Sequence, residues 1–150
     1  MNKILALIIA FAFVFSLVSC SNEPDTYRLL CEFVKTYGAE GVIYYPDAAE
    51  GEDGYITKGF IKKIYIFYGN FPDSFAILLN SRTDYSSECG IFSCDDAEML
   101  QMVEEMCLER IRLICHGDDR AFVKRSGKIV FYSTMPDRVR AERIFSEIIR

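Results

Sequence analysis

The first 20 residues constrain the fold most strongly, because they separate a targeting segment from the part of the chain that can build a domain. Lys3 precedes an apolar run over residues 4–18 whose one polar member is Ser16. A positive charge, a short apolar run and a small-residue site are typical of a secretory signal peptide. The run has 15 residues, whereas a membrane-spanning helix needs roughly 20. We therefore expect residues 1–19 to be a signal peptide that takes no part in the fold.

The end of this segment, Leu17-Val18-Ser19-Cys20, resembles the lipobox of bacterial lipoproteins. In that family the cysteine thiol carries a diacylglycerol, and the chain is cut just before the cysteine. The resemblance implies lipidation at Cys20, a lipidated tether over residues 20–25 and an anchor on the extracytoplasmic face of the bacterial membrane. A single acyl chain binds membranes only marginally, so a stable anchor needs a second one. The alternative is an uncleaved signal anchor with an unmodified Cys20.

Residues 26–150 have the length of one ordinary domain and are expected to form a single α+β domain. The chain has 17 Lys and Arg residues against 22 Asp and Glu residues, and loss of Lys3 with the signal peptide leaves a formal charge of −6. Residues 20–109 carry 6 basic and 17 acidic residues, whereas residues 110–150 carry 10 basic and 5 acidic ones. Such an asymmetry can indicate a charged partner. An exported, net acidic protein is not expected to bind nucleic acid.

Hydrophobic spacing predicts four helices and four strands in the domain. The helices are expected between Asp25 and Gly38, over 57–68, over 96–115 with Asp95 as its cap and Gly117 as its end, and after Pro136. The strands are expected over 75–80, 88–94, 121–125 and 128–133. The pattern predicts a two-layer fold, in which a four-stranded antiparallel sheet in ββα-ββα order carries its two long helices across one face. The two additional N-terminal helices would cover an end or part of the other face.

Three segments give the chain a resemblance to a known family. They are Tyr65-Ile66-Phe67-Tyr68-Gly69, then Glu88-Cys89-Gly90-Ile91-Phe92-Ser93-Cys94 running into the helix capped at Asp95, and Gly127-Lys128-Ile129-Val130. The chain resembles, over roughly residues 55–150, an uncharacterised family of small lipoproteins from Gram-positive bacteria that is filed as a domain of unknown function. The resemblance implies a location and a fold, and it implies no activity and no catalytic residues.

Five cysteines remain after Cys20, and an odd number outside the cell leaves at least one thiol without an intramolecular partner. They are Cys31, Cys89, Cys94, Cys107 and Cys115. Strand rise and helix rise place Cys89 and Cys107 at similar heights if the helix folds back on its strand, so we expect these two to lie close together as a possible disulfide. A zinc site on the last four cysteines is the weaker alternative, because their spacing lacks the close pairs of zinc sites.

Other groups that could carry chemistry have ordinary structural readings. His116, the one histidine, follows Cys115, and a Cys–His pair can form a nucleophile or a metal site. Neighbouring residues on a helix do not face each other, however, and a histidine in the last helical turn interacts favourably with the helix dipole. The acidic loop over 47–53 could hold calcium, but it lacks the ligand order of a calcium-binding loop. Five tyrosines could form a stacking platform for sugars or be half-buried in the ordinary way. These are Tyr44, Tyr45, Tyr55, Tyr65 and Tyr68.

A basic face is expected from the hairpin around Ser126-Gly127 and the closing helix. Its residues are Arg120, Lys124, Arg125, Lys128, Arg138, Arg140 and Arg143. Their summed potential could bind anionic lipid head groups or an anionic envelope polymer. The alternative is that they neutralise the acidic half of the same fold through surface pairs of little energetic value.

The leading functional hypothesis is a non-enzymatic binding or interaction module on the outer face of the membrane. The sequence contains none of the motifs G-x-S-x-G, G-x-x-x-x-G-K-[ST], G-x-G-x-x-G, H-E-x-x-H and C-x-x-C. We therefore expect no cofactor and no metal, and no protein partner is indicated. The alternatives are a cell-envelope enzyme with an unrecognised active site, which a deep pocket with clustered titratable groups would favour, and a structural subunit of an envelope complex.

Overall fold

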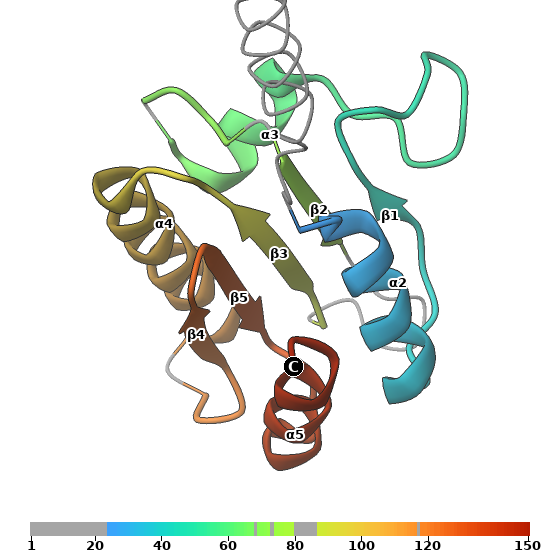
Figure 1. Ribbon diagram of the computed structural model, residues 1–150, viewed down its shortest axis with the longest axis vertical. Helices are drawn as coiled ribbons and strands as arrows, with labels where there is room; N and C mark the ends of the chain where they lie inside the picture. The colour runs from blue at the N-terminus through green and yellow to red at the C-terminus, as the bar shows by residue number, and fades with distance from the viewer. Residues whose placement is uncertain (1–23, 68, 73, 80–86, 117) are drawn as a thin grey trace, which may run out of the picture.

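The computed structural model describes residues 24–67, 69–72, 74–79, 87–116 and 118–150, and these form one sheet with helices on both faces (Figure 1). In the described residues the helices are α2 (Thr26–Tyr37), α3 (Lys58–Tyr65), α4 (Ala97–Cys115) and α5 (Arg138–Ile148). The strands of the same residues are β1 (Ile43–Tyr44), β2 (Ser74–Leu78), β3 (Cys89–Ser93), β4 (Phe122–Ser126) and β5 (Ile129–Ser133). The α+β class and the antiparallel sheet are confirmed.

The sheet has the order β1-β2-β3-β5-β4, and all of its neighbouring strands are antiparallel. The expected number of four strands is therefore wrong. The fifth strand, β1, has two residues, which is too short for an alternating pattern to reveal, and it is defined by its pairing of Ile43 with Leu78 at the sheet edge. From β2 onward the order is two strands and a helix, twice over. Strand β1 lies between the two N-terminal helices and was not expected, so the order of the whole domain is not matched exactly.

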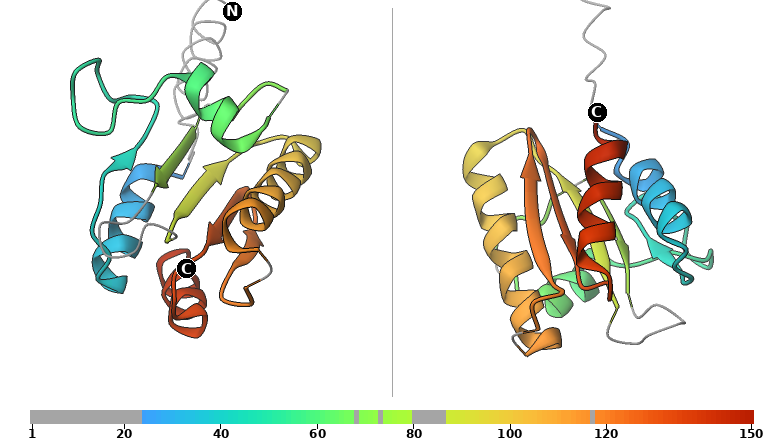
Figure 2. Two further views of the ribbon diagram at one scale, coloured as in Figure 1. Left: turned by 180° about the vertical axis from the view of Figure 1, so that it is seen from behind. Right: turned by 90° about the horizontal axis from the view of Figure 1, so that it is seen from below.

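Helices cover both faces of the sheet, so the expected two-layer arrangement with both long helices on one face is wrong. Helices α2 and α5 lie side by side on one face, and α3 and α4 lie on the other (Figure 2). The strands explain this, because β3 and β5 are buried along their whole length. A strand covered on both faces has apolar residues at consecutive positions. In β3, Ile91 packs towards α2 and α5, and its neighbour Phe92 packs towards α3 and α4.

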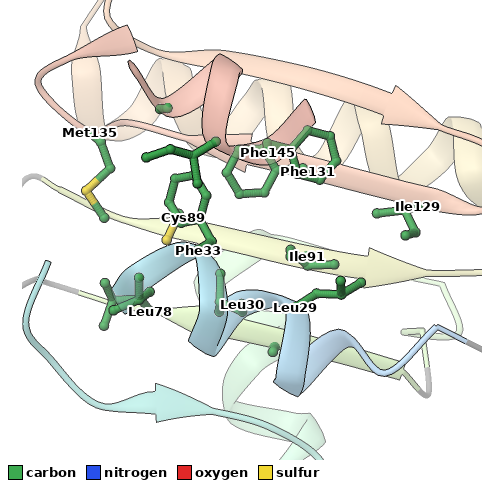
Figure 3. Close-up of a cluster of buried hydrophobic side chains, with 14 of the residues drawn as sticks. Leu29, Leu30, Phe33, Leu78, Cys89, Ile91, Ile129, Phe131, Met135 and Phe145 are labelled. Atoms are coloured by element: carbon green, nitrogen blue, oxygen red, sulfur yellow. The ribbon is translucent and has the colours of Figure 1, made fainter. Parts of the chain in front are cut away.

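The core under α2 and α5 is built on stacked aromatic rings. Figure 3 shows the rings of Phe33 of α2, Phe131 of β5 and Phe145 of α5 gathered in this core. The ring centroids of Phe131 and Phe145 lie 4.3 Å apart in a stacked pair, and those of Phe33 and Phe131 lie 4.8 Å apart edge to face. Both cores draw all of their described members from residues 29–149. The domain therefore contains the packing that holds it together.

Helix ends differ from the expected ones by small shifts. The side chain of Asp96, and not of Asp95, caps α4 by accepting a hydrogen bond from the backbone of Met99 at 2.8 Å. Helix α3 ends at Tyr65 because Ile66 adopts a left-handed conformation with φ 51°, so the helix is shorter than expected. Asp137 caps α5, which places Pro136 before the helix and not in its first turn.

Two helix ends fit the expectation more closely. Asp25 caps α2, and Gly38 ends it in the left-handed conformation that glycine adopts without steric cost. The expected end of α4 at Gly117 lies outside the described residues, but His116 before it already closes the helix at φ 48°. Within the described part of the chain, every helix is too short or too polar to cross a membrane.

Candidate functional site

A cleft of about 730 Å³ opens at the β1 edge of the sheet, on the face covered by α3 and α4. Its walls come from the segment before β1, from β1 itself, from the segment before α3, from α3 and from the residue after β2. These residues are Gly41, Val42, Tyr44, Tyr55, Ile56, Thr57, Phe60, Ile64 and Leu79. Glu88 and Arg110 complete the lining and are the charged members of it. The walls are thus mainly apolar, and one ion pair supplies the charged groups.

The backbone on both sides of Glu88 is fixed before β3 begins. The amide of Glu88 donates to Thr134 Oγ1 at 2.7 Å, and the amide of Thr134 donates to the carbonyl oxygen of Glu88 at 2.9 Å. Thr134 itself follows β5, the central neighbour of β3. The Glu88 side chain is therefore held at the end of the sheet where β3 starts, with 2 % of its surface exposed.

Arg110 of α4 binds the Glu88 carboxylate through two parallel hydrogen bonds. Arg110 Nη2 donates to Oε1 at 2.6 Å, and Nε donates to Oε2 at 3.0 Å. Arg110 Nη1 also donates to the carbonyl oxygen of Ile64 at the end of α3, at 3.3 Å. Bidentate pairs of this kind are among the stronger hydrogen bonds in proteins because both partners are charged and the geometry of the fork matches the carboxylate. The pair therefore ties α4 and α3 to the sheet.

Two buried tyrosines continue the network below the ion pair. Tyr132 donates to Glu88 Oε2 at 3.4 Å, and the hydroxyls of Tyr65 and Tyr132 lie 2.7 Å apart. Either hydroxyl can be the donor in the short hydrogen bond between Tyr65 and Tyr132. Burial raises the pKa of both hydroxyls well above the ordinary tyrosine value, so both stay protonated at neutral pH.

Arg110 remains charged despite its partial burial. Burial lowers the pKa of the guanidinium, but the hydrogen bonds and the negative charge of Glu88 outweigh this, so the pKa of Arg110 is raised. Its side chain is 16 % exposed and faces the cleft. Within the described residues, the hydrogen bonds to Glu88 and Ile64 use three of the five guanidinium N–H groups.

The expected pair of Cys89 and Cys107 does not come together. Cys89 points into the core under α2 and α5, and Cys107 of α4 lies in the core on the opposite face. Both are free thiols, and burial raises the pKa of each. Strand rise and helix rise predict similar heights for the two cysteines, but they do not predict on which face of the sheet Cys89 lies. In the structure it lies on the face away from α4.

Five of the seven basic residues have partners within the fold. Lys128 pairs with Asp95, Arg120 with Asp118 and Arg138 with Glu142. Arg140 donates to the carbonyl oxygen of Thr36 and lies over the Tyr37 ring, and Lys124 donates to Ser146 on the α5 face of the sheet. Arg125 is the next residue of β4 and so projects to the opposite face. Arg143 is exposed on α5. These contacts are of the kind expected if the basic residues pair with groups of the same fold, which is the alternative to an anion-binding face.

The remaining candidates are spread over the molecule. Tyr44 and Tyr55 line the cleft, Tyr65 is buried below it, Tyr45 stacks on Tyr27 at 4.1 Å, and Tyr68 lies outside the described residues. A sugar platform on these five rings is therefore not assembled. His116 is exposed at the end of α4. In the described part of the chain, no three His, Cys, Asp or Glu side chains gather as metal ligands would, in the 47–53 loop or elsewhere.

Sequence reasoning missed Glu88 and Arg110, although each carries a signal. Val103, Cys107 and Arg110 follow one another at helical spacing on α4, so Arg110 occupies a position that faces the core. Glu88 likewise begins an apolar strand. Charged residues are rarely buried unless they are paired. One acidic and one basic residue at core positions of neighbouring elements therefore predict a buried pair.

Comparison of the chain with family models, with curated proteins and with solved structures gives no match. The resemblance to the lipoprotein family stays a prediction from the sequence.

Proposed function

We propose that the chain is a lipoprotein of the Gram-positive family it resembles, anchored through lipid on Cys20 to the extracytoplasmic face of the membrane. Its domain acts there as a non-enzymatic binding module, and the cleft beside Glu88 and Arg110 is the binding site. The observation that carries the proposal is this cleft. Its volume of about 730 Å³ and its mainly apolar walls with a few polar groups suit a small-molecule site.

The polar groups of the cleft support binding over catalysis. A cleft with clustered titratable groups also suits an enzyme. Here, however, both oxygens of Glu88 already accept hydrogen bonds, from Arg110 and Tyr132, so Glu88 is placed to hold Arg110 and not to take a proton from a substrate. Tyr65 and Tyr132 are buried and have raised pKa values, so neither reaches a ligand nor ionises readily.

The position of the cleft supports access from the side away from the membrane. Thr26 at the start of α2 bonds to Ser74 at the start of β2, at 3.2 Å. Leu78 at the other end of β2 pairs with Cys89, which follows Glu88. Glu88, on the floor of the cleft, therefore lies at the end of the sheet opposite to the start of α2. A lipid on Cys20, four residues before Pro24, leaves a tether of at most about 14 Å and holds the entry end towards the bilayer.

Metabolic labelling with a clickable fatty acid tests the anchor. The wild type should carry the label and sediment with membranes, and Cys20→Ala should lose both properties. Cys31→Ala is the matched control, since it removes another partly exposed cysteine and should keep the label. Equal labelling of the wild type and Cys20→Ala would overturn the proposed anchor.

A further inference from the structure

We infer that the cleft binds a monocarboxylic acid with an apolar body, whose carboxylate is held by Arg110. This inference rests on the proposed binding function and names the class of ligand. It is carried by the unused donors of Arg110, by the balance of charge at the floor of the cleft and by the walls around it.

The guanidinium of Arg110 has donors left for a ligand. Nε and one N–H of Nη2 are used by Glu88, and one N–H of Nη1 is used by the carbonyl of Ile64. Counted over the described residues, Nη1 and Nη2 each keep one N–H. A planar carboxylate has two oxygens that can accept from both nitrogens of a guanidinium. The bonds to Glu88 and Ile64 also hold the guanidinium in place before a ligand arrives.

The charge of the site limits the ligand to a single negative charge. A guanidinium has donors and no acceptor, so it recognises an acceptor and repels a cation. The Glu88 carboxylate lies 2.6 Å from Arg110 Nη2 and balances its charge. A second negative charge, as on a phosphate monoester, would therefore meet Glu88 without a further cation in the lining. The inferred ligand therefore differs from the anionic envelope polymers expected from the sequence, which carry many negative charges.

The walls define the rest of the ligand. Val42, Ile56, Ile64 and Leu79 line the same cleft as Arg110, and so does Phe60, of which 58 % of the surface is exposed. Large apolar side chains left exposed around a concave surface are typical of a binding site. An aliphatic or aromatic body would cover these residues and gain the free energy of apolar burial.

Three naphthalene probes that differ in the head group test the inference by fluorescence titration of the lipid-free domain, residues 24–150. The probes are 2-naphthoate, the neutral 2-naphthalenemethanol and 2-naphthyl phosphate. We expect 2-naphthoate to bind at least about tenfold more tightly than the alcohol, which is the size of one charged hydrogen bond. The phosphate should bind more weakly than the carboxylate at a pH where it is doubly ionised.

Variants connect the preference to the named residues. Glu88→Gln with Arg110→Gln keeps the floor neutral and polar, and it should abolish the preference for the acid. Glu88→Gln alone removes the competing negative charge and should tighten 2-naphthoate about threefold or more without changing the alcohol. Phe60→Ala should weaken acid and alcohol by the same factor. Arg112→Gln is the control, since Arg112 is 74 % exposed on the same helix and should leave all affinities unchanged.

The outcomes separate the two proposals. Equal affinity for acid and alcohol, or the same preference in the double variant, would overturn the carboxylate inference and leave a binding cleft in place. Tighter binding of the phosphate would overturn the inferred single charge. Failure of all three probes to bind would overturn both the inference and the cleft as the binding site.

Discussion

The guanidinium of Arg110 and the carboxylate of Glu88 meet through two hydrogen bonds of 2.6 and 3.0 Å, although 22 positions separate the residues in the chain. Glu88 directly precedes the central strand β3, and Arg110 belongs to the third quarter of α4. The pair joins the sheet to the helix layer and provides the polar floor of the cleft. Stability and the proposed ligand binding therefore depend on the same two side chains.

Removal of one member of this pair is expected to destabilise the domain strongly. Arg110→Met leaves the buried Glu88 charge without its partner, and we expect a loss of about 3 kcal/mol in the free energy of unfolding. Arg110→Met combined with Glu88→Leu removes both charges and should recover most of the loss. Urea unfolding of the three proteins measures both effects. A double variant less stable than the single one would contradict this account of the pair.

Gly90 is expected to resist substitution because of a close approach. A Cβ at this position would lie 2.7 Å from Tyr132 Cε1 and 2.8 Å from Ile77 Cγ2. We expect Gly90→Ala to cost about 1–3 kcal/mol, as overpacked cores do. Gly59→Ala in α3 meets nothing within 4 Å and is the matched control. It should be neutral or stabilise the domain by up to about 1 kcal/mol through helix propensity. Thermal unfolding compares the two variants. A Gly90→Ala domain more stable than the Gly59→Ala domain would contradict the close packing around Gly90.

The two aspartates before α4 are expected to contribute differently to the stability of the domain. Asp96→Ala removes the cap of the helix and should cost about 1 kcal/mol. Asp95→Ala removes an exposed pair with Lys128 and should cost less than about 0.5 kcal/mol. Chemical denaturation of the two variants at one ionic strength compares them. An equal or larger loss in Asp95→Ala would mean that Asp95 provides the cap.

The buried tyrosines predict a loss of stability in alkali. Burial raises the pKa of Tyr65 and Tyr132 above the ordinary value of 10.0, so the unfolded chain ionises first as the pH rises. Their contribution to stability is complete below pH 10.0 and falls as the pH rises from there towards the folded-state pKa. Each tyrosine should contribute a slope of up to about 1.4 kcal/mol per pH unit.

Tyr65→Phe should therefore lower the slope of unfolding free energy against pH above pH 10.0 by that amount. Tyr55→Phe is the control, because this side chain is exposed at the cleft. Urea unfolding between pH 9 and 11.5 gives the slopes. The same slope in the wild type and Tyr65→Phe would mean that Tyr65 ionises alike in both states.

The sequence predicts most elements of this fold because they depend on local patterns. Asp25 and Gly38 mark the ends of α2, and the apolar spacing of α4 gives its length. Strand β1 was missed because two residues show no alternation, and its existence depends on pairing with Leu78. The faces of the sheet could not be assigned because every residue of β3 is buried, so alternation does not say which helix Cys89 or Phe92 meets.

The candidate site was harder to predict, for a related reason. The expected candidates were residues whose chemical type suggests function, such as the cysteines and the basic cluster. The sheet separates Cys89 from Cys107, and Lys128 and Arg138 pair with Asp95 and Glu142. Glu88 and Arg110 come together through the long-range packing of α4 on β3. The local pattern shows that each is a charged residue at a core position, but it does not predict which residue is its partner.

Backbone NMR of the lipid-free domain during titration with 2-naphthoate tests the central claim most directly. The account predicts that the largest shifts fall on the amides of the cleft, at Gly41, Thr57, Ile64 and Leu79 and at the Nε–H of Arg110. The α5 face, represented by Leu30 and Phe145, should stay unchanged. Shifts centred on the β4–β5 hairpin at Arg125 and Lys128, with an unchanged Arg110 signal, would contradict the cleft as the binding site.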